Sequence, residues 1–209
     1  MAKIGIMGGT FNPIHLGHIK LAQTAYEQLN LDTIWFMPSK NPPHKDTTDI
    51  VSEEDRVAML KLAIKDFNYF QFSDIELNRD GTTYTSYTME YLHTLSETDK
   101  NYATNKYFFI VGADSIFNIE SWNRPEVLFK LTSFAVACRD DVDTISLTNQ
   151  CNYLKDKYNA HISIISMDKI DISSSYIRQR YRTKDYLYNH KDYVHPDVHT
   201  YILKNELYH

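Results

Sequence analysis

Short apolar runs alternate with longer amphipathic stretches along most of this 209-residue chain. The short runs have the length and composition of buried strands, and they are Ile4–Met7, Thr33–Met37, Phe70–Ile75, Tyr107–Val111, Ser133–Ala137 and Ile162–Ile165. The stretches between them carry apolar residues at helical spacing and predict helices near 16–29, 53–66, 84–96, 125–131, 145–158, 174–182 and 196–207. This alternation predicts an α/β fold, a doubly wound parallel sheet with helices on both faces.

Such a sheet has one functional edge. Right-handed crossovers put every strand-to-helix loop at the carboxyl ends of the strands, and ligands bind there, where the strand order reverses. We find no repeat, low-complexity tract or interdomain linker, so we expect a single domain over residues 1–209. Residues 184–209 are expected to form a C-terminal helical extension that packs on this domain.

Composition narrows the class of protein. The 22 Lys and Arg residues are outnumbered by 27 Asp and Glu residues, for a formal charge of −5, which argues against nucleic acid as a partner. No apolar run is long enough to span a bilayer, and the N-terminus lacks a signal pattern, so no membrane association is expected. Two isolated cysteines, Cys138 and Cys151, favour a reduced cytoplasmic setting. The oligomeric state is left open, a homo-oligomer included.

The first strand runs directly into a segment with unusual chemistry, Gly8–His18, which reads GGTFNPIHLGH. Tandem glycines let backbone N–H groups approach a phosphate, and the helix that follows adds the positive end of its dipole. His15 and His18 are three residues apart, so their rings are expected on one side of the first turn. The segment is neither a P-loop, nor a G-x-G-x-x-G fingerprint, nor an H-E-x-x-H zinc motif. It predicts a polyphosphate site; the alternative is a tight turn with two surface histidines.

Two further motifs follow the second and third strands. Pro38–Lys45 (PSKNPPHK) is a proline-stiffened loop whose His44 and Lys45 could bind an anionic group or simply be solvated. Gly81–Thr88 (GTTYTSYT) places hydroxyl residues before a helix, which by itself is typical of an N-cap with several free backbone donors.

Three features lie after the later strands. Asp114 follows the fourth strand, where a carboxylate can bind ribose hydroxyls or cap the next short helix. Trp122 in a polar stretch can stack on a flat ring or be a packing residue. Asp171–Arg178 (DISSSYIR) sets serines ahead of a helix that carries Arg178, whose planar donors suit phosphate oxygens; the alternative is a serine cap with a surface arginine.

The first of these motifs resembles the His-x-Gly-His signature of the nucleotidyltransferase superfamily. Together, in order from residue 4 to residue 178, the motifs are similar to those of bacterial nicotinate-nucleotide adenylyltransferases, a family with a Rossmann-like fold. Two positions depart from the family pattern. Asn12 stands where Asp is common, and either side chain can hold the turn, whereas Asn123 stands where Tyr is common and its role is open.

The resemblance implies adenylyl transfer from ATP to nicotinate mononucleotide, which gives deamido-NAD and pyrophosphate in NAD biosynthesis. It implies charge handling during catalysis by His15, His18, Lys45 and Arg178. It implies ATP contacts by Gly8, Gly9, Thr10, Phe11, Gly112, Asp114, Ser173, Ser174, Ile177 and Arg178. It implies nicotinate mononucleotide contacts by Asn41, His44, Lys45, Thr85 and Trp122. Mg²⁺ is expected to arrive with ATP, and no dedicated metal site is expected.

Three other functions compete with this one. A nicotinamide mononucleotide adenylyltransferase would differ only in taking an amide in place of a carboxylate. A non-catalytic nucleotide-binding regulator is disfavoured by the intact histidines and Arg178. An aminoacyl-tRNA synthetase shares the histidine signature, but the chain has no room for tRNA-binding domains and no Lys-Met-Ser-Lys-Ser loop.

Overall fold

The computed structural model describes residues 2–40, 49–100, 102–139, 144–168, 170–184 and 193–208. Its strands are β1 (Lys3–Gly9), β2 (Thr33–Pro38), β3 (Phe70–Phe72), β4 (Lys106–Gly112), β5 (Ser133–Arg139) and β6 (Ile162–Met167). Its α-helices are α1 (Leu16–Leu29), α2 (Glu53–Ile64), α3 (Thr85–Thr98), α4 (Ala113–Phe117), α5 (Pro125–Leu131), α6 (Thr144–Tyr158), α7 (Ser174–Arg182) and α9 (Pro196–Lys204). A single 3₁₀ turn, η2, spans Ile119–Ser121.

Every strand and helix predicted from the hydrophobic pattern is present, and the differences lie at the ends. The third strand stops at Phe72 instead of Ile75, because the carbonyl of Asp74 accepts hydrogen bonds from the N–H groups of Leu77 and Asn78 and turns the chain. The last helix ends at Lys204 and is followed by turns rather than continuing to residue 207.

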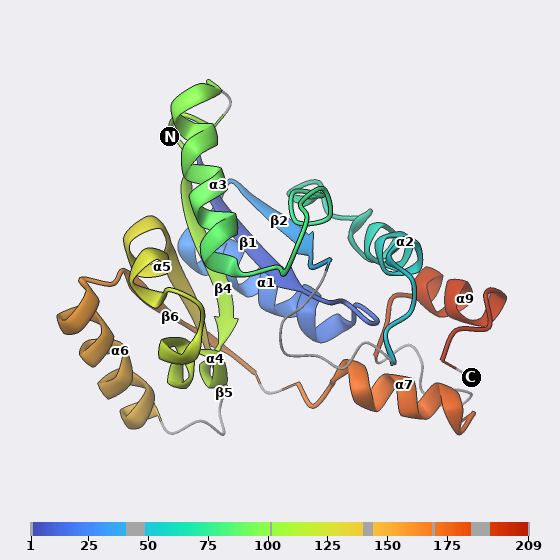
Figure 1. The fold of residues 1–209 in the computed structure, drawn as a ribbon. Helices are drawn as coiled ribbons and strands as arrows, with labels where there is room; N and C mark the ends of the chain where they lie inside the picture. The colour runs from blue at the N-terminus through green and yellow to red at the C-terminus, as the bar shows by residue number, and fades with distance from the viewer. Residues whose placement is uncertain are drawn as a thin grey trace.

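All six strands are parallel, in the order β3-β2-β1-β4-β5-β6. This order is typical of nucleotide-binding doubly wound sheets, and it reverses between β1 and β4. The predicted fold class is therefore confirmed, with the switch point at the two strands that end in glycine (Figure 1).

Alternate residues of each strand enter two apolar layers, one on each face of the sheet. In β4, Phe108 and Ile110 join the layer formed with α1, α2, α7 and α9, whereas Tyr107, Phe109 and Val111 join the layer formed with α3, α4, α5 and α6. Burial on both faces explains why the strands read as continuous apolar runs rather than alternating ones.

The C-terminal helix α9 packs against α2, far from it in sequence (Figure 1). Val198 and Ile202 of α9 are buried in the same apolar layer as α1 and α2. An ion pair between Lys65 and Asp197 lies at this contact. Among the helices that the structure describes, none is long and apolar enough to cross a membrane.

Candidate active site at the carboxyl edge of the sheet

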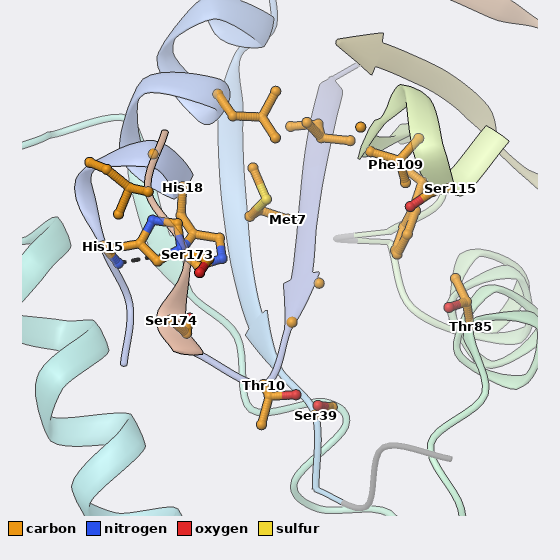
Figure 2. A pocket seen from close by; sticks show the side chains of 18 of the residues that line it. Met7, Thr10, His15, His18, Ser39, Thr85, Phe109, Ser115, Ser173 and Ser174 are labelled. Atoms are coloured by element: carbon orange, nitrogen blue, oxygen red, sulfur yellow. Dashed lines mark hydrogen bonds between the residues drawn. The ribbon is translucent and has the colours of Figure 1, made fainter. Parts of the chain in front are cut away.

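A cavity of about 510 Å³ opens at the carboxyl ends of β1 and β4, at the switch point of the sheet. The chain elements that meet there are the ends of both strands, the start of α1, the loop before α7 and the segment before α3. The residues that line it, from these elements and from the end of β2, α4 and the turn after η2, include Gly8, Gly9, Thr10, His15, Gly17, His18, Ser39, Glu76, Thr83, Thr85, Gly112, Ser115, Trp122, Ser173 and Ser174. Figure 2 shows the two histidines beside Ser173 on one side of the cavity, with Thr85 and Ser115 on the other.

The two imidazoles lie one against the other, as their spacing predicts. Their ring centroids are 3.7 Å apart, and the backbone N–H of His15 donates to Nδ1 of His18 at 3.3 Å. The buried Phe11 ring packs against His18 in a T-shaped arrangement, with 5.2 Å between the ring centroids. A Cβ at Gly17 would lie 3.0 Å from Nδ1 of His15, so glycine at this position makes room for the imidazole.

The loop between β1 and α1 is tied in place through its carbonyl groups. Nη1 of Arg56, a buried arginine of α2, donates to the carbonyl of Thr10 at 2.8 Å. The hydroxyl of Ser174 donates to the carbonyl of Pro13 at 2.9 Å. Burial lowers the pKa of Arg56 from its ordinary value. These contacts connect the loop to α2 and α7.

Hydroxyl groups line the part of the cavity near this loop. The Ser39 side chain is 8% exposed, and its hydroxyl has no hydrogen-bond partner among the described residues. A buried polar group without a partner is costly, and a polar ligand in the cavity would supply one. On the facing side, the Ser173 hydroxyl caps α7 by accepting from the N–H of Tyr176 at 3.1 Å, so the capping role is confirmed for this serine.

A side cavity of about 150 Å³ adjoins the main one and shares Thr83, Thr85 and Trp122 with it. Helix α3 begins here at Thr85, and the side chain of its N-cap residue, Tyr84, makes no capping hydrogen bond. The free N–H groups of a helix N-terminus attract anions, a carboxylate included. The Trp122 ring stands edge-on to Phe109, with centroids 6.2 Å apart. Asn123, whose role the sequence left open, accepts a 2.8 Å hydrogen bond from the Ser86 hydroxyl and so joins this loop to α3.

Glu76 is a lining residue that the sequence motifs did not reveal. Its side chain is 6% exposed, and it accepts a 2.7 Å hydrogen bond from the hydroxyl of Thr88. Burial raises the pKa of Glu76 to about 7, although the Thr88 hydrogen bond and the nearby Arg79 oppose the rise. A carboxylate just after the third strand was the available signal, because that position falls on the functional edge of the sheet.

The structure brings most of the predicted residues together, and a few lie elsewhere. The residues that line the cavity as expected are Gly8, Gly9, Thr10, His15, His18, Thr85, Gly112, Trp122, Ser173 and Ser174. The side chains of Phe11 and Ile177 are buried in the core, each 2% exposed. Asp114 is exposed in the first turn of α4, and the residue that caps this helix is Gly112, so the capping role considered for Asp114 is wrong.

Arg178 and three residues of the Pro38–Lys45 loop are the remaining predicted site residues. The guanidinium of Arg178 does not line the cavity; its Nη1 donates to the carbonyl of Asn12 at 3.0 Å. Asn41, His44 and Lys45 lie outside the described residues. Within the described part of the chain, no group of three or more His, Cys, Asp or Glu side chains could hold a metal ion.

Comparison with known proteins supports one family. The cytidylyltransferase-like family model matches residues 6–180. A protein of Carboxydothermus hydrogenoformans named a probable nicotinate-nucleotide adenylyltransferase is 42% identical over 99% of this chain and 98% of its own. A protein of the same name from Lachnoclostridium phytofermentans is 38% identical over the whole of both chains.

The fold is similar to that of solved structures of Plasmodium falciparum nicotinic acid mononucleotide adenylyltransferase. The complex with NaAD has a TM-score of 0.78 at 22% identity, over 100% of this chain and 98% of that chain. The complex with APC has a TM-score of 0.75 at 20% identity, over the same shares.

Proposed function

The chain belongs to the cytidylyltransferase-like family and, within it, to the nicotinate-nucleotide adenylyltransferases, and we propose that its cavity at the β1–β4 switch point is the catalytic site. The reaction is adenylyl transfer from ATP to nicotinate mononucleotide, which yields deamido-NAD and pyrophosphate.

One observation carries this proposal: two adjoining cavities, which share Thr83, Thr85 and Trp122, offer two kinds of site. The main cavity has the glycines of β1, the adjacent rings of His15 and His18 and the start of α7, which suit a triphosphate. The side cavity has the start of α3 and the Trp122 ring, which suit a carboxylate on an aromatic ring. Two substrates that react with each other must bind side by side, and adjoining cavities allow this.

The chemistry follows from the substrates. A phosphate oxygen of the mononucleotide forms a bond to the α-phosphorus of ATP, and the bond from that phosphorus to the pyrophosphate oxygen breaks. The attacking phosphate is already ionised at pH 7, so no base is required. The protein's contribution is to align the two phosphates and to stabilise negative charge as pyrophosphate leaves. We assign that charge stabilisation to His15 and His18, with Lys45 and Arg178 as further donors.

Mg²⁺ is proposed to enter with ATP. The ion prefers oxygen ligands and retains water, and it neutralises charge on the phosphates when bound. The residues present fit this mode of binding, because the hydroxyls of Thr10 and Ser39 lie where they can hydrogen-bond to phosphate oxygens or metal-bound water.

The second substrate is proposed to bind between α3 and the Trp122 loop. The carboxylate of nicotinate would lie at the start of α3 beside Thr85, and the ring would lie against Trp122. The adenosine ribose is assigned to the start of α4, at Gly112 and Asp114. Asn41, His44 and Lys45 are proposed to contact the mononucleotide, as the family resemblance implies.

We also propose that residues 1–209 are one nucleotidyltransferase domain with 184–209 as its extension. This is supported by Val198 and Ile202 of α9, which are buried in the same apolar layer as α1 and α2.

A pyrophosphate-release assay tests the function. The purified chain is given ATP with nicotinate mononucleotide, nicotinamide mononucleotide or phosphopantetheine, and with no acceptor. We expect the rate of pyrophosphate release to be clearly higher with nicotinate mononucleotide than with nicotinamide mononucleotide. Equal rates for acid and amide would refute the assigned specificity, and no release with any acceptor would favour a nucleotide-binding regulator.

A further inference from the structure

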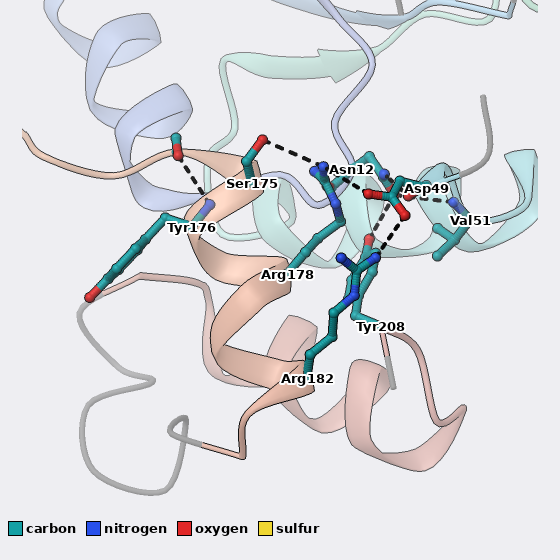
Figure 3. Close-up of polar contacts among 9 residues, drawn as sticks. Asn12, Asp49, Val51, Ser175, Tyr176, Arg178, Arg182 and Tyr208 are labelled. Atoms are coloured by element: carbon teal, nitrogen blue, oxygen red, sulfur yellow. Dashed lines mark hydrogen bonds and ion pairs between the residues drawn. The ribbon is translucent and has the colours of Figure 1, made fainter. Parts of the chain in front are cut away.

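Asn12 lies in the loop between β1 and α1, residues 10–15, which we call the phosphate loop. Its buried side chain is the centre of a polar network (Figure 3). Its side-chain Nδ2 donates to the carbonyl of Asp49 at 2.8 Å, and its Oδ1 accepts from the N–H of Val51 at 3.3 Å. The amide therefore uses both its donor and its acceptor, which a carboxylate could not do at neutral pH. The loop that carries it leads directly from Gly9 to His15.

The second donor to Oδ1 of Asn12 comes from the far end of the chain. The hydroxyl of Tyr208 donates to it at 2.9 Å, across 196 positions in sequence. Tyr208 is 7% exposed, and its ring packs near Tyr181 of α7, at 6.3 Å between centroids. Burial raises the pKa of Tyr208, so the phenol keeps its proton and remains a donor at neutral pH.

The backbone of Asn12 also forms a hydrogen bond with Arg178. The backbone carbonyl of Asn12 accepts from Nη1 of Arg178, and Nη2 of this arginine lies 4.0 Å from the carboxylate of Asp49. Asp49 in turn accepts a 2.8 Å hydrogen bond from Arg182. The phosphate loop, the segment before α2 and Arg178 of α7 thus meet at Asn12, and Tyr208 connects the C-terminal segment to this point.

We propose that Tyr208 is a positioning residue for ATP: its hydroxyl fixes the Asn12 amide, and through Asn12 it fixes the phosphate loop and Arg178 relative to the cavity. The inference rests on the proposed function for the identity of ATP. If the hydroxyl is removed, Asn12 keeps the longer hydrogen bond from Val51, so the network is loosened rather than left with an orphaned group. The loss is then expected in ligand binding more than in folding.

Tyr208→Phe is the minimal test, because it keeps the buried ring and removes only the hydroxyl. We expect KM for ATP, and Kd for a non-hydrolysable ATP analogue measured by calorimetry, to rise roughly fivefold, the effect of losing one ordinary hydrogen bond. KM for nicotinate mononucleotide should stay unchanged. A smaller folded fraction would lower the maximal rate without moving either KM, so this split separates positioning from stability.

Tyr201→Phe is the matched control. Its hydroxyl belongs to the same C-terminal segment but donates to Asp55 of α2, at 3.0 Å, instead of to Asn12. We expect this variant to bind the ATP analogue as the wild type does. If it weakens binding as much as Tyr208→Phe does, general loosening of the C-terminal segment is the cause, and the proposal is overturned.

A double-mutant cycle tests the route through Asn12. In an Asn12→Ala background, Tyr208→Phe should have no further effect on Kd, because its partner is gone. Additive effects would overturn the proposal, as would unchanged Kd in Tyr208→Phe alone. The analogue-binding series does not depend on turnover, so an inactive wild type would refute the proposed function while the role of Tyr208 is still decided.

Discussion

The raised pKa of the buried Glu76 carboxyl group leads to a quantitative prediction about the stability of the protein. In the folded protein its pKa is raised from 4.5 to about 7, chiefly by burial. Between these two values the folded state holds a proton that the unfolded state has released. The free energy of unfolding must therefore fall as pH rises through this window and level off above about pH 7.

The size of the effect follows from the difference between the two values. Each tenfold change in a dissociation constant corresponds to about 1.4 kcal/mol, so ionised Glu76 costs at most about 3–4 kcal/mol well above pH 7. Glu76→Gln removes the titration and keeps an oxygen that can accept from Thr88. We expect the stability of this variant relative to the wild type to increase by up to about 3 kcal/mol between pH 5 and pH 8.

Urea unfolding followed by circular dichroism at several pH values measures this change. Because the amide also changes stability by an amount that does not depend on pH, the pH dependence of the difference is the test. Glu27→Gln, at an exposed position on α1, is the control and should follow the wild-type curve. A difference between Glu76→Gln and the wild type that stays flat from pH 5 to pH 8 would refute the account of Glu76.

Three further predictions concern the site. His18→Ala should lower turnover at least ~100-fold, about 2.7 kcal/mol of transition-state stabilisation, and near-wild-type turnover of a folded variant would exclude the assigned role. Gly17→Ala should lower kcat about tenfold in a folded protein, because the new methyl group would lie 3.0 Å from Nδ1 of His15 and displace the ring; unchanged kcat would contradict this. Thr88→Val should destabilise the protein by about 1–3 kcal/mol in urea unfolding by leaving Glu76 without its donor, and a loss below a few tenths would show that Glu76 has another partner.

The sequence predicts the fold well because the signals are local and repeated. The strands are buried on both faces and read as apolar runs, and the glycines that end β1 and β4 mark the switch point. The two histidines were predictable for the same reason, because their spacing within one helical turn alone determines that the rings meet.

The remaining features depend on contacts between distant parts of the chain. Nothing near Asn12 in sequence shows that Tyr208 will bond to it, and local reasoning assigned Asn12 only to its own turn. Glu76 gives no motif, because its burial is produced by the packing of α3 and the turn after β3. Arg178 was expected near the phosphates, and its own motif does not show that its guanidinium donates to the carbonyl of Asn12, 166 positions away in sequence.

The most direct measurement follows the adenylyl group itself. The purified chain is incubated with nicotinate mononucleotide and ATP labelled at the α-phosphate, and the products are separated and counted. We predict that the label appears in deamido-NAD in step with pyrophosphate release, and that His18→Ala abolishes most of this transfer. Label that stays in ATP, or that appears in AMP without the dinucleotide, would contradict the account.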